Sequence, residues 1–341
     1  MKTVVFGTRR KDPATPWRRQ WLLLLLLPAV LVSCDRRELT YYMESEITVT
    51  ADWSRSDLDE EQERGATLVV YARDGSEPRV YLMGERQGTT IRLPEGRYDA
   101  VVFNHTFDDF ASISFRGQEK LETLEAYAKE VVTRADTRVI VSSPDKLAAA
   151  VVRDFEVTED MLGNYAPSVT RGSCPAEVCR MHFQPVPLTR KVEVKLHVRG
   201  LVNVREARCT LYGVPLSVLL HNGEVREETG GQEFTVTDPS LYEGSWQDGT
   251  LTGTINLFGQ EQLPHTATLK ALLVDGQTVT EQKLENLVVK EETDDNGSLV
   301  LSIEARTPEP FPDVKPQGGG ESGFGAEVED WNKEEQVEIP L

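Results

Sequence analysis

Four short turn signals in the second half of this sequence restrict what it folds into. Each is an Asn or Asp followed by Gly: Asn222-Gly223, Asp248-Gly249, Asp275-Gly276 and Asn296-Gly297. Two-residue β-hairpins need residues with positive φ, and these dipeptides adopt it at little steric cost. Four such signals within about 75 residues predict consecutive antiparallel strands.

The segments around these turns alternate apolar and polar residues, which is typical of strands with one buried face. Val192, Val194, Leu196 and Val198 give the clearest example. Further strands are expected at residues 207–211, 216–220, 233–237, 249–257, 266–274, 281–289 and 298–305. In the first half, Ile47, Val49, Ala51 and Trp53 alternate in the same way, and strands are expected at 67–72, 79–83, 89–93 and 98–103. The pattern predicts a mainly β protein built as an antiparallel sandwich or barrel.

Two short helices are predicted to interrupt the strands of the first half. The apolar residues Leu121, Leu124, Ala128 and Val131 are spaced by three, four and three, which suits a helix with one buried stripe. Ser143-Pro144-Asp145 resembles an N-cap followed by proline at the first helical position, and predicts a helix that continues to about residue 151.

The length of the chain indicates two sandwich domains, because about 300 residues exceed one ordinary core. Residues 159–187 are rich in Gly, Pro, Ser and Asn, so we place a boundary near residue 184. The predicted parts are a signal peptide at 1–33, an N-terminal domain at 34–184 and a C-terminal domain at 185–341.

The C-terminal domain ends in a spacer and a separate apolar strand. Residues 307–325 are rich in Pro and Gly, and Val337, Ile339 and Leu341 alternate after them. Such a strand either completes its own sheet or is lent to the sheet edge of a neighbour. These three residues are therefore candidates for strand exchange.

The first 34 residues have the three parts of a secretory signal in order. Six basic residues come first, and residues 21–33 form a charge-free apolar run that is too short to span a bilayer. The run ends in Leu31-Val32-Ser33-Cys34, the pattern of a lipobox. We predict that Cys34 becomes the first mature residue and carries covalent acyl lipid, which holds the protein to a membrane. The alternative is an ordinary signal peptide or membrane anchor with an incidental cysteine.

The charge of the mature chain excludes one class of partner. Removal of residues 1–33 leaves 31 basic against 55 acidic residues and a formal charge of −24. Such a surface repels phosphate, and no basic cluster interleaved with aromatic residues offsets it. We therefore expect no nucleic-acid partner.

Three cysteines remain after Cys34. Cys174 and Cys179 lie in a loop-like stretch and are predicted to close a small disulfide ring. With His182 they form an alternative zinc set, which lacks an evident fourth ligand. Cys209 alternates with Ala207 and Leu211, and is expected to be a buried apolar residue.

No catalytic constellation is found, so we predict no enzyme, no metal and no cofactor. The five histidines form no pair at metal-binding spacing, and no nucleophile elbow, phosphate loop or dinucleotide motif occurs. Asp294-Asp295 resembles a calcium loop only loosely, since the glutamate at position twelve is missing. Asp108-Asp109 lies between Phe107 and Phe110, and exposed aromatic rings there would suit a glycan. A hydrolase would need converging acids that the sequence does not display.

Several segments together resemble the fimbrillin-related lipoproteins of Gram-negative bacteria. They are the lipobox followed by Arg37-Glu38-Leu39, the early strand ending in Asp52-Trp53, the segment from Leu93 to Asn104, and the Gly-rich spacer with Asp330-Trp331 and a final strand. The resemblance spans nearly the whole mature chain. It implies two transthyretin-like, Greek-key β-sandwich domains in tandem, bound by lipid to the outer membrane.

The resemblance also implies a function through protein contacts, as a fimbrial anchor, accessory or adhesion subunit with fimbrillin-like partners. Some relatives exchange a strand after a protease removes the first one, and Arg55 and Arg64 are candidate cleavage points. Asp35-Arg36-Arg37-Glu38 departs from the acidic run seen in some surface-exported lipoproteins. The sequence therefore leaves the membrane face open, and a glycan-binding surface lipoprotein is the alternative function.

Overall fold

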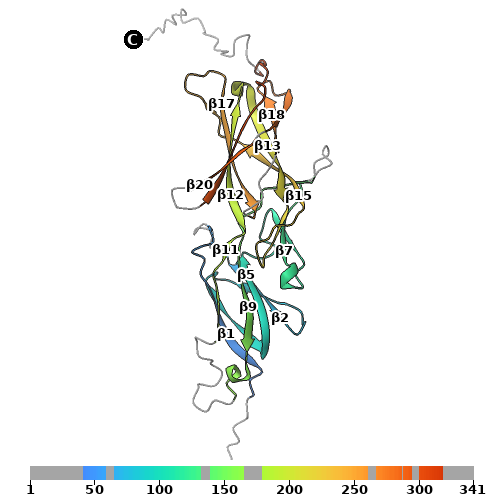
Figure 1. Cartoon of the computed structure of the whole chain (residues 1–341), viewed down its shortest axis with the longest axis vertical. Coiled ribbons are helices and arrows are strands. Elements are labelled where there is room, and N and C mark those ends of the chain that lie inside the picture. Colours follow the sequence, from blue (N-terminus) through green and yellow to red (C-terminus); the bar gives the residue numbers. More distant parts are fainter. Residues whose placement is uncertain are drawn as a thin grey trace, which may run out of the picture. The chain divides into compact units, whose positions relative to one another are not determined.

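A computed structural model describes residues 41–58, 65–131, 139–164, 179–259, 266–285, 287–293 and 299–317. The chain divides into two compact units, Met1–Tyr42 and Met43–Leu341, and all elements described below belong to the second. Within the described residues, regular structure consists of β-strands and three short 3₁₀ helices (Figure 1). The predicted mainly β class is confirmed, whereas the predicted helices are not found.

Two facing sheets form a first sandwich. One has the order β10-β1-β4, and the other has the order β11-β9-β5-β2-β3. The strands are β1 (Glu44–Ala51), β2 (Ala66–Ala72), β3 (Arg79–Met83), β4 (Gly88–Pro94), β5 (Gly96–Asn104), β9 (Ala148–Val157), β10 (Arg180–Phe183) and β11 (Val186–Pro187). Their pairings are antiparallel except for β1 with β10, which is parallel.

The core of the first sandwich confirms the alternation predicted for its first strand. Ile47, Val49 and Ala51 of β1 are buried together with Trp53 just after it. The Trp53 indole Nε1 donates a 2.7 Å hydrogen bond to the Arg86 carbonyl, so the one polar atom of this ring is satisfied inside the core.

A second sandwich is formed by strands that lie mostly after residue 188. One sheet has the order β16-β17-β12-β21-β20, and the other has the order β19-β18-β13-β15-β8. The strands are β8 (Ile140–Val141), β12 (Thr189–Val198), β13 (Val204–Pro215), β15 (Thr229–Val236), β16 (Ser240–Leu241), β17 (Gly249–Phe258), β18 (Thr266–Leu273), β19 (Val279–Leu284), β20 (Val288–Thr293) and β21 (Leu299–Arg306). The four apolar residues that alternate along β12 are all buried in its core, as predicted. Two pairings, β12 with β21 and β15 with β8, are parallel.

A small third sheet joins the two sandwiches. It has the order β14-β7-β6, with β6 (Ile113–Arg116), β7 (Glu125–Ala128) and β14 (Ser217–Leu219). A third apolar cluster surrounds it and includes Phe103 of β5, Val218 of β14 and Phe258 of β17. Because β8 pairs with the second sandwich and β14 pairs with β7, segments cross the junction in both directions. The chain passes between sandwiches from β11 to β12, and the division into domains at 184/185 stays a prediction.

The turn signals had different outcomes. Asp275-Gly276 connects the antiparallel strands β18 and β19, and Gly276 has φ of 68°. Gly223 has φ of 73° beside the antiparallel bridge between Val218 and Val225. Asn296-Gly297 lies outside the described residues, between the antiparallel strands β20 and β21. The two-residue hairpin predicted at Asp248-Gly249 is wrong, since β16 ends at Leu241 and Gly249 is already the first residue of β17.

The helix predicted from residue 121 is also wrong. A 3₁₀ helix, η2 (Leu121–Thr123), accounts for the first apolar spacing, and β7 follows directly. Pairing on both sides with β6 and β14 satisfies the backbone of this short segment. The nonlocal pairing therefore outweighs a weak local helical pattern.

The second predicted helix is replaced by β9, an inner strand of the first sandwich. Ser143 does not cap a helix, because its Oγ accepts a 2.8 Å hydrogen bond from the Asn256 amide of β17. The Asn256 side chain in turn donates to the Pro144 carbonyl at 3.0 Å. The residues that resembled a helix start thus hold an extended segment against the second sandwich.

Candidate functional site

Several of the candidate residues singled out from the sequence lie outside the described residues. They are Cys34, Arg64, Cys174, His265, Asp294, Asp295, Val337, Ile339 and Leu341. Lipidation at Cys34 and strand exchange by the terminal strand therefore stay predictions. Arg55 lies in a turn after β1, where its Nη1 donates a 3.4 Å hydrogen bond to the Gln184 side chain.

Cys179 is disulfide-bonded and 2% exposed. Its carbonyl accepts a 2.8 Å hydrogen bond from the Thr48 amide, where β10 begins its parallel pairing with β1. The pairing with Cys174 stays a prediction. A sulfur in a disulfide offers no thiolate to a metal, so the alternative zinc set loses one of its ligands.

Cys209 is a free cysteine in the core of the second sandwich, as predicted. Burial raises the pKa of its thiol to about 12. The sulfur is therefore protonated and inert at physiological pH.

The described histidines do not converge with other titratable groups on a catalytic centre. His182 Nδ1 lies 3.0 Å from the Thr50 hydroxyl on the outside of β1. His221 lines an open groove of about 920 Å³ beside the third sheet, and burial lowers its pKa. Among the described residues, no group of three His, Cys, Asp or Glu side chains is arranged to hold a metal.

The loop that suggested glycan binding does not offer exposed aromatic rings, which corrects that expectation. Phe110 is 3% exposed, and Phe107 packs against the same apolar cluster. The ring of Phe115 lies 5.0 Å from that of Phe107 and 5.4 Å from that of Phe110. These rings form core at the junction, because an aromatic cluster gains more from mutual burial than from contact with water.

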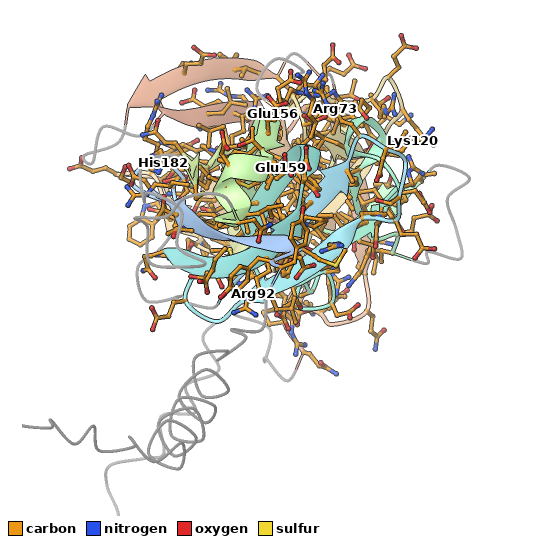
Figure 2. All side chains as sticks on the ribbon, turned by 90° about the horizontal axis from the view of Figure 1, so that it is seen from below. Arg73, Arg92, Lys120, Glu156, Glu159 and His182 are labelled. Atoms are coloured by element: carbon orange, nitrogen blue, oxygen red, sulfur yellow. The ribbon has the colours of Figure 1, made fainter. Side chains whose placement is uncertain are left out.

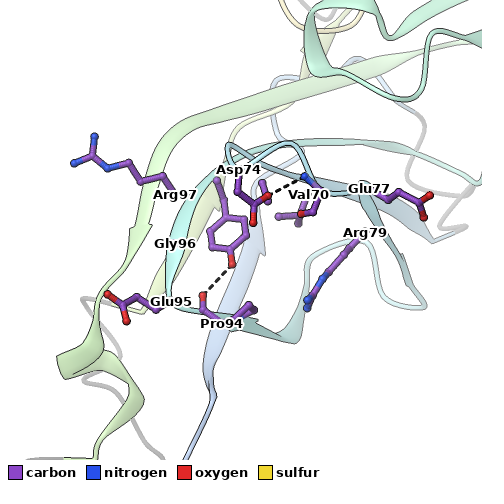
Figure 3. Close-up of a pocket in the computed structure, with 11 residues that line it drawn as sticks. Val70, Asp74, Glu77, Arg79, Pro94, Glu95, Gly96 and Arg97 are labelled. Carbon is purple, nitrogen blue, oxygen red and sulfur yellow. Dashed lines mark hydrogen bonds between the residues drawn. The ribbon is translucent and has the colours of Figure 1, made fainter.

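A small pocket of about 260 Å³ lies at one end of the first sandwich (Figure 3). The Tyr98 ring lines it, and the Tyr98 hydroxyl donates a 2.9 Å hydrogen bond to the Pro94 carbonyl. Asp74 is held in a turn by the Ser76 amide, a hydrogen bond that lowers the pKa of its carboxyl group. The lining mixes carboxylates with Arg79 and Arg97 and contains no histidine or cysteine.

Several charged side chains on the first sandwich are exposed and paired with each other. Arg92 lies 3.9 Å from Glu46, and Arg97 lies 3.5 Å from Glu156. Figure 2 shows Arg92 and Glu156 projecting from the ribbon. Such exposed pairs contribute little to stability and provide a hydrated surface.

A loop of the second sandwich presents apolar side chains to solvent. Residues 241–247, here called the aromatic loop, connect β16 to β17 and include Leu241 (49% exposed), Tyr242 (40%) and Trp246 (88%). Backbone hydrogen bonds join Tyr242 to Asp248 at 3.0 Å and Ser245 to Tyr242 at 2.9 Å. The Ser245 Oγ also accepts from the Asp248 amide at 2.9 Å. The loop is therefore held in place by its own hydrogen bonds, while the Trp246 side chain is exposed to solvent.

The sequence reasoning missed this loop because the Asp248-Gly249 signal was assigned to a short hairpin. The available signal of an exposed loop was the segment Tyr242-Glu243-Gly244-Ser245-Trp246. Aromatic residues that lie among turn residues are not on the buried face of a strand, so they tend to be exposed to solvent.

An open groove of about 890 Å³ lies next to the aromatic loop. We call it the cationic groove, after the side chains of Arg199, Lys283 and Arg306 in its lining. His197 also lines it, hydrogen-bonds to the Tyr242 hydroxyl and stacks on that ring with centroids 6.0 Å apart. Burial and the nearby Arg306 lower the pKa of His197, so its ring is neutral at pH 7.

The charges of the cationic groove are only partly balanced. Arg199, Lys283 and Arg306 form no ion pair with any residue in the described part of the chain. Of the two carboxylates in the lining, Glu304 is already paired with Lys290 at 3.2 Å, which leaves Glu285. The groove is therefore locally positive on a protein of formal charge −19.

No helix among the described residues has the length and apolarity needed to cross a membrane.

Comparisons with known proteins relate the chain to proteins of Bacteroides. A Bacteroides ovatus protein provisionally named fimbrium anchoring subunit Fim4B is 24% identical over 359 residues, covering 95% of this chain and 98% of its own. A crystal structure of a B. ovatus protein provisionally described as an adhesin is 20% identical with a TM-score of 0.53, covering 82% of this chain and 98% of its own. The fimbrial anchor protein Mfa2 of Porphyromonas gingivalis has a TM-score of 0.40 at 13% identity, covering 76% of this chain and 95% of its own.

One family model matches the N-terminal part of the chain and continues into the second sandwich. It covers residues 33–235, which is more than half of the chain, and describes a domain of unknown function, DUF5119. The match extends into β15 and so includes the three strands of the junction sheet. This chain belongs to the DUF5119 family.

Proposed function

We propose that this protein is a lipid-anchored subunit of a cell-surface fimbrium that acts through protein contacts as an anchor or accessory subunit. The observation that carries the proposal is the alignment with the provisionally named fimbrium anchoring subunit, which extends over 95% of this chain and 98% of that relative. An alignment of that extent relates whole proteins rather than one shared domain. It agrees with the family resemblance predicted from the sequence.

The structure supports a role in contact rather than in catalysis. His182 forms a hydrogen bond with Thr50 and His197 with Tyr242, and the larger grooves are open and lined by strands and loops. A β-sandwich offers sheet edges and loops for association with other subunits. The aromatic rings of the Phe107 loop are in the core, so this particular loop does not support the glycan alternative.

The proposed anchor requires lipid on Cys34. In the native bacterium, labelled palmitate is expected to enter the wild-type protein and to be absent from a Cys34→Ala variant. A Cys209→Ala variant is the matched control, because Cys209 is buried in the fold and should not affect labelling. Equal labelling of the wild-type and Cys34→Ala proteins would show that the anchor is not at this residue.

The fimbrial role is tested by deleting the gene in its native host and measuring fimbriae on cells and in the medium. Loss of an anchor should move most fimbrial protein from the cell fraction to the medium, and the wild-type gene should restore it. Expression of Cys34→Ala should release fimbriae as the deletion does. An unchanged amount, length and attachment of fimbriae in the deletion strain would contradict the proposal.

A further inference from the structure

The aromatic loop and the cationic groove form one continuous surface. Tyr242 belongs to the loop, and its hydroxyl contacts His197, which lines the groove. Gly200 also holds the end of the loop, since its amide donates a 2.8 Å hydrogen bond to the carboxylate of Asp248, the residue that follows the loop. Val202, 42% exposed, adds an apolar side chain where its amide meets the Gln247 carbonyl. The surface therefore combines exposed apolar side chains with three cations that form no ion pair with a described residue, and hydrogen bonds hold its loop in place.

This combination suits a polypeptide segment that is both acidic and apolar. Trp, Tyr and Arg are the residues that contribute most to protein contacts, and this surface presents all three. Unpaired cations on an acidic protein favour a negatively charged ligand and repel a basic one. The apolar loop adds a requirement for large apolar side chains in the ligand.

The sequence of this chain contains such a segment at residues 326–341. It has six acidic residues against the single Lys333, and it carries five large apolar side chains: Val328, Trp331, Val337, Ile339 and Leu341. This segment lies outside the described residues.

The connection to the surface is short. The Phe311 amide donates a 2.9 Å hydrogen bond to the carbonyl of Arg199, which lines the groove, and the described chain ends six residues later at Gln317. Residues 318–325 span at most roughly 29 Å. A tether of that length gives an effective concentration in the millimolar range, so even a weak contact is populated.

We propose that residues 326–341 dock on the same chain, with their carboxylates in the cationic groove and their apolar side chains against the aromatic loop. This docking covers Trp246 and neutralises Arg199, Lys283 and Arg306. It places the terminal segment on the second sandwich and does not depend on the fimbrial role.

Site-specific cross-linking on the full mature chain, with Cys34→Ala to avoid lipid, tests this docking. A benzophenone amino acid replaces Leu241 in one variant and Val80 of β3 in its control, two apolar residues that are 49% and 50% exposed. Illumination should link the Leu241 probe to peptides from 326–341 within a monomer, at least about fivefold more than the Val80 probe. A probe in place of Lys283 should link to the same peptides.

Charge-reversal variants distinguish the local effect of the cationic groove from the effect of the overall charge of the protein. Arg199→Glu with Arg306→Glu should lower the yield from the Leu241 probe by about fivefold, as should 1 M salt, which shortens the screening length from about 10 Å at 0.1 M to 3 Å. Arg92→Glu with Arg97→Glu, on the first sandwich, makes the same change of charge and should leave the yield unchanged. Equal yields from both probes, no effect of the groove variant, or links only between two chains would overturn the proposal.

Discussion

At the scale of single residues, Glu125 of β7 shows how a charge is accommodated at the junction. Its side chain is 6% exposed, and its carboxylate accepts hydrogen bonds from Arg116 Nε at 3.0 Å and Nη2 at 2.8 Å. Arg226 lies 3.8 Å away. Burial acts to raise the pKa of Glu125, but the hydrogen bonds from Arg116 and the positive charges of Arg116 and Arg226 outweigh it and hold the pKa below its usual value.

Replacement of this carboxylate should destabilise the fold. Glu125→Gln keeps the shape but leaves the Arg116 guanidinium without its charged partner, and a hydrogen bond to a charged group is worth about 2 kcal/mol. We expect a loss of about that size in the free energy of unfolding, measured by urea denaturation at pH 7. Glu122→Gln is the control, because Glu122 is 60% exposed in its 3.3 Å pair with Arg153 and should change stability by less than about 0.5 kcal/mol. Equal effects of the two substitutions would show that burial of Glu125 does not increase the contribution of its ion pair to the free energy of unfolding.

At the scale of elements, the first residue of β17 is a glycine because of close packing and not because of its backbone angle. A Cβ on Gly249 would lie 2.2 Å from the Ser240 carbonyl oxygen, 2.7 Å from the Leu201 side chain and 2.8 Å from the Leu241 Cα. Any larger residue therefore forces β16 away from β17.

Gly249→Ala should destabilise the protein by about 2 kcal/mol, within the range measured for overpacking. It should also increase the rate of proteolysis in the aromatic loop, because β16 holds one end of that loop. Gly84→Ala is the matched control, since a Cβ there meets nothing within 4 Å and Gly84 has no positive φ. The urea midpoint and the rate of proteolysis are measured for both variants. A Gly249→Ala protein with the same urea midpoint as the wild type would contradict the packing argument.

The strand pattern could be predicted from the sequence wherever one face of a strand is buried and the other is exposed to solvent. β12 is the best case, with apolar and polar residues in strict alternation. β9 was missed because Ala148, Ala149 and Ala150 suit a helix locally, and only pairing with β5 makes them a strand. The residues 281–289 were expected as one strand, yet β19 ends at Leu284 in one sheet and β20 starts at Val288 in the other. Pairing between distant segments decides these cases, and it leaves little local signal.

The candidate site was less accessible to sequence reasoning than the fold. A signal such as the lipobox before Cys34 is local and can be recognised directly. Exposure of Trp246 could not be predicted, because exposure depends on where β16 ends. Likewise, Arg199, Lys283 and Arg306 come from three separate segments, and only the fold brings them to one groove.

At the scale of the whole molecule, two opposing effects decide how stability depends on pH. The chain has a formal charge of −19 at pH 7 and an isoelectric point near 4.8, so acidification first relieves general repulsion. Against this, the fold lowers the pKa of His197 and His221 through burial. It also lowers the pKa of Asp99 and Glu125, where hydrogen bonds from Arg73 and Arg116 outweigh burial.

For each of these four groups, the unfolded chain binds protons more tightly than the folded protein does. The free energy of unfolding therefore falls as pH falls. The histidine contribution declines below their ordinary pKa of 6.5, and the carboxylate contribution declines as pH passes below 4.5 for Glu125 and 3.8 for Asp99. General repulsion is long-ranged and is screened at 0.5 M salt, where the screening length is about 4 Å, whereas the buried groups are screened much less.

At 0.5 M salt we therefore expect the urea midpoint to fall in two steps, from pH 7.5 to 5.5 and again from 5.5 to 3.5. A variant with His197→Gln and His221→Gln should lose most of the first step and keep the second, because its carboxylates are unchanged. His182→Gln is the control, since His182 lies on the outside of β1 and its loss should leave both steps in place. A midpoint that rises from pH 7.5 to 5.5 at this salt concentration would mean that relief of repulsion outweighs the buried histidines.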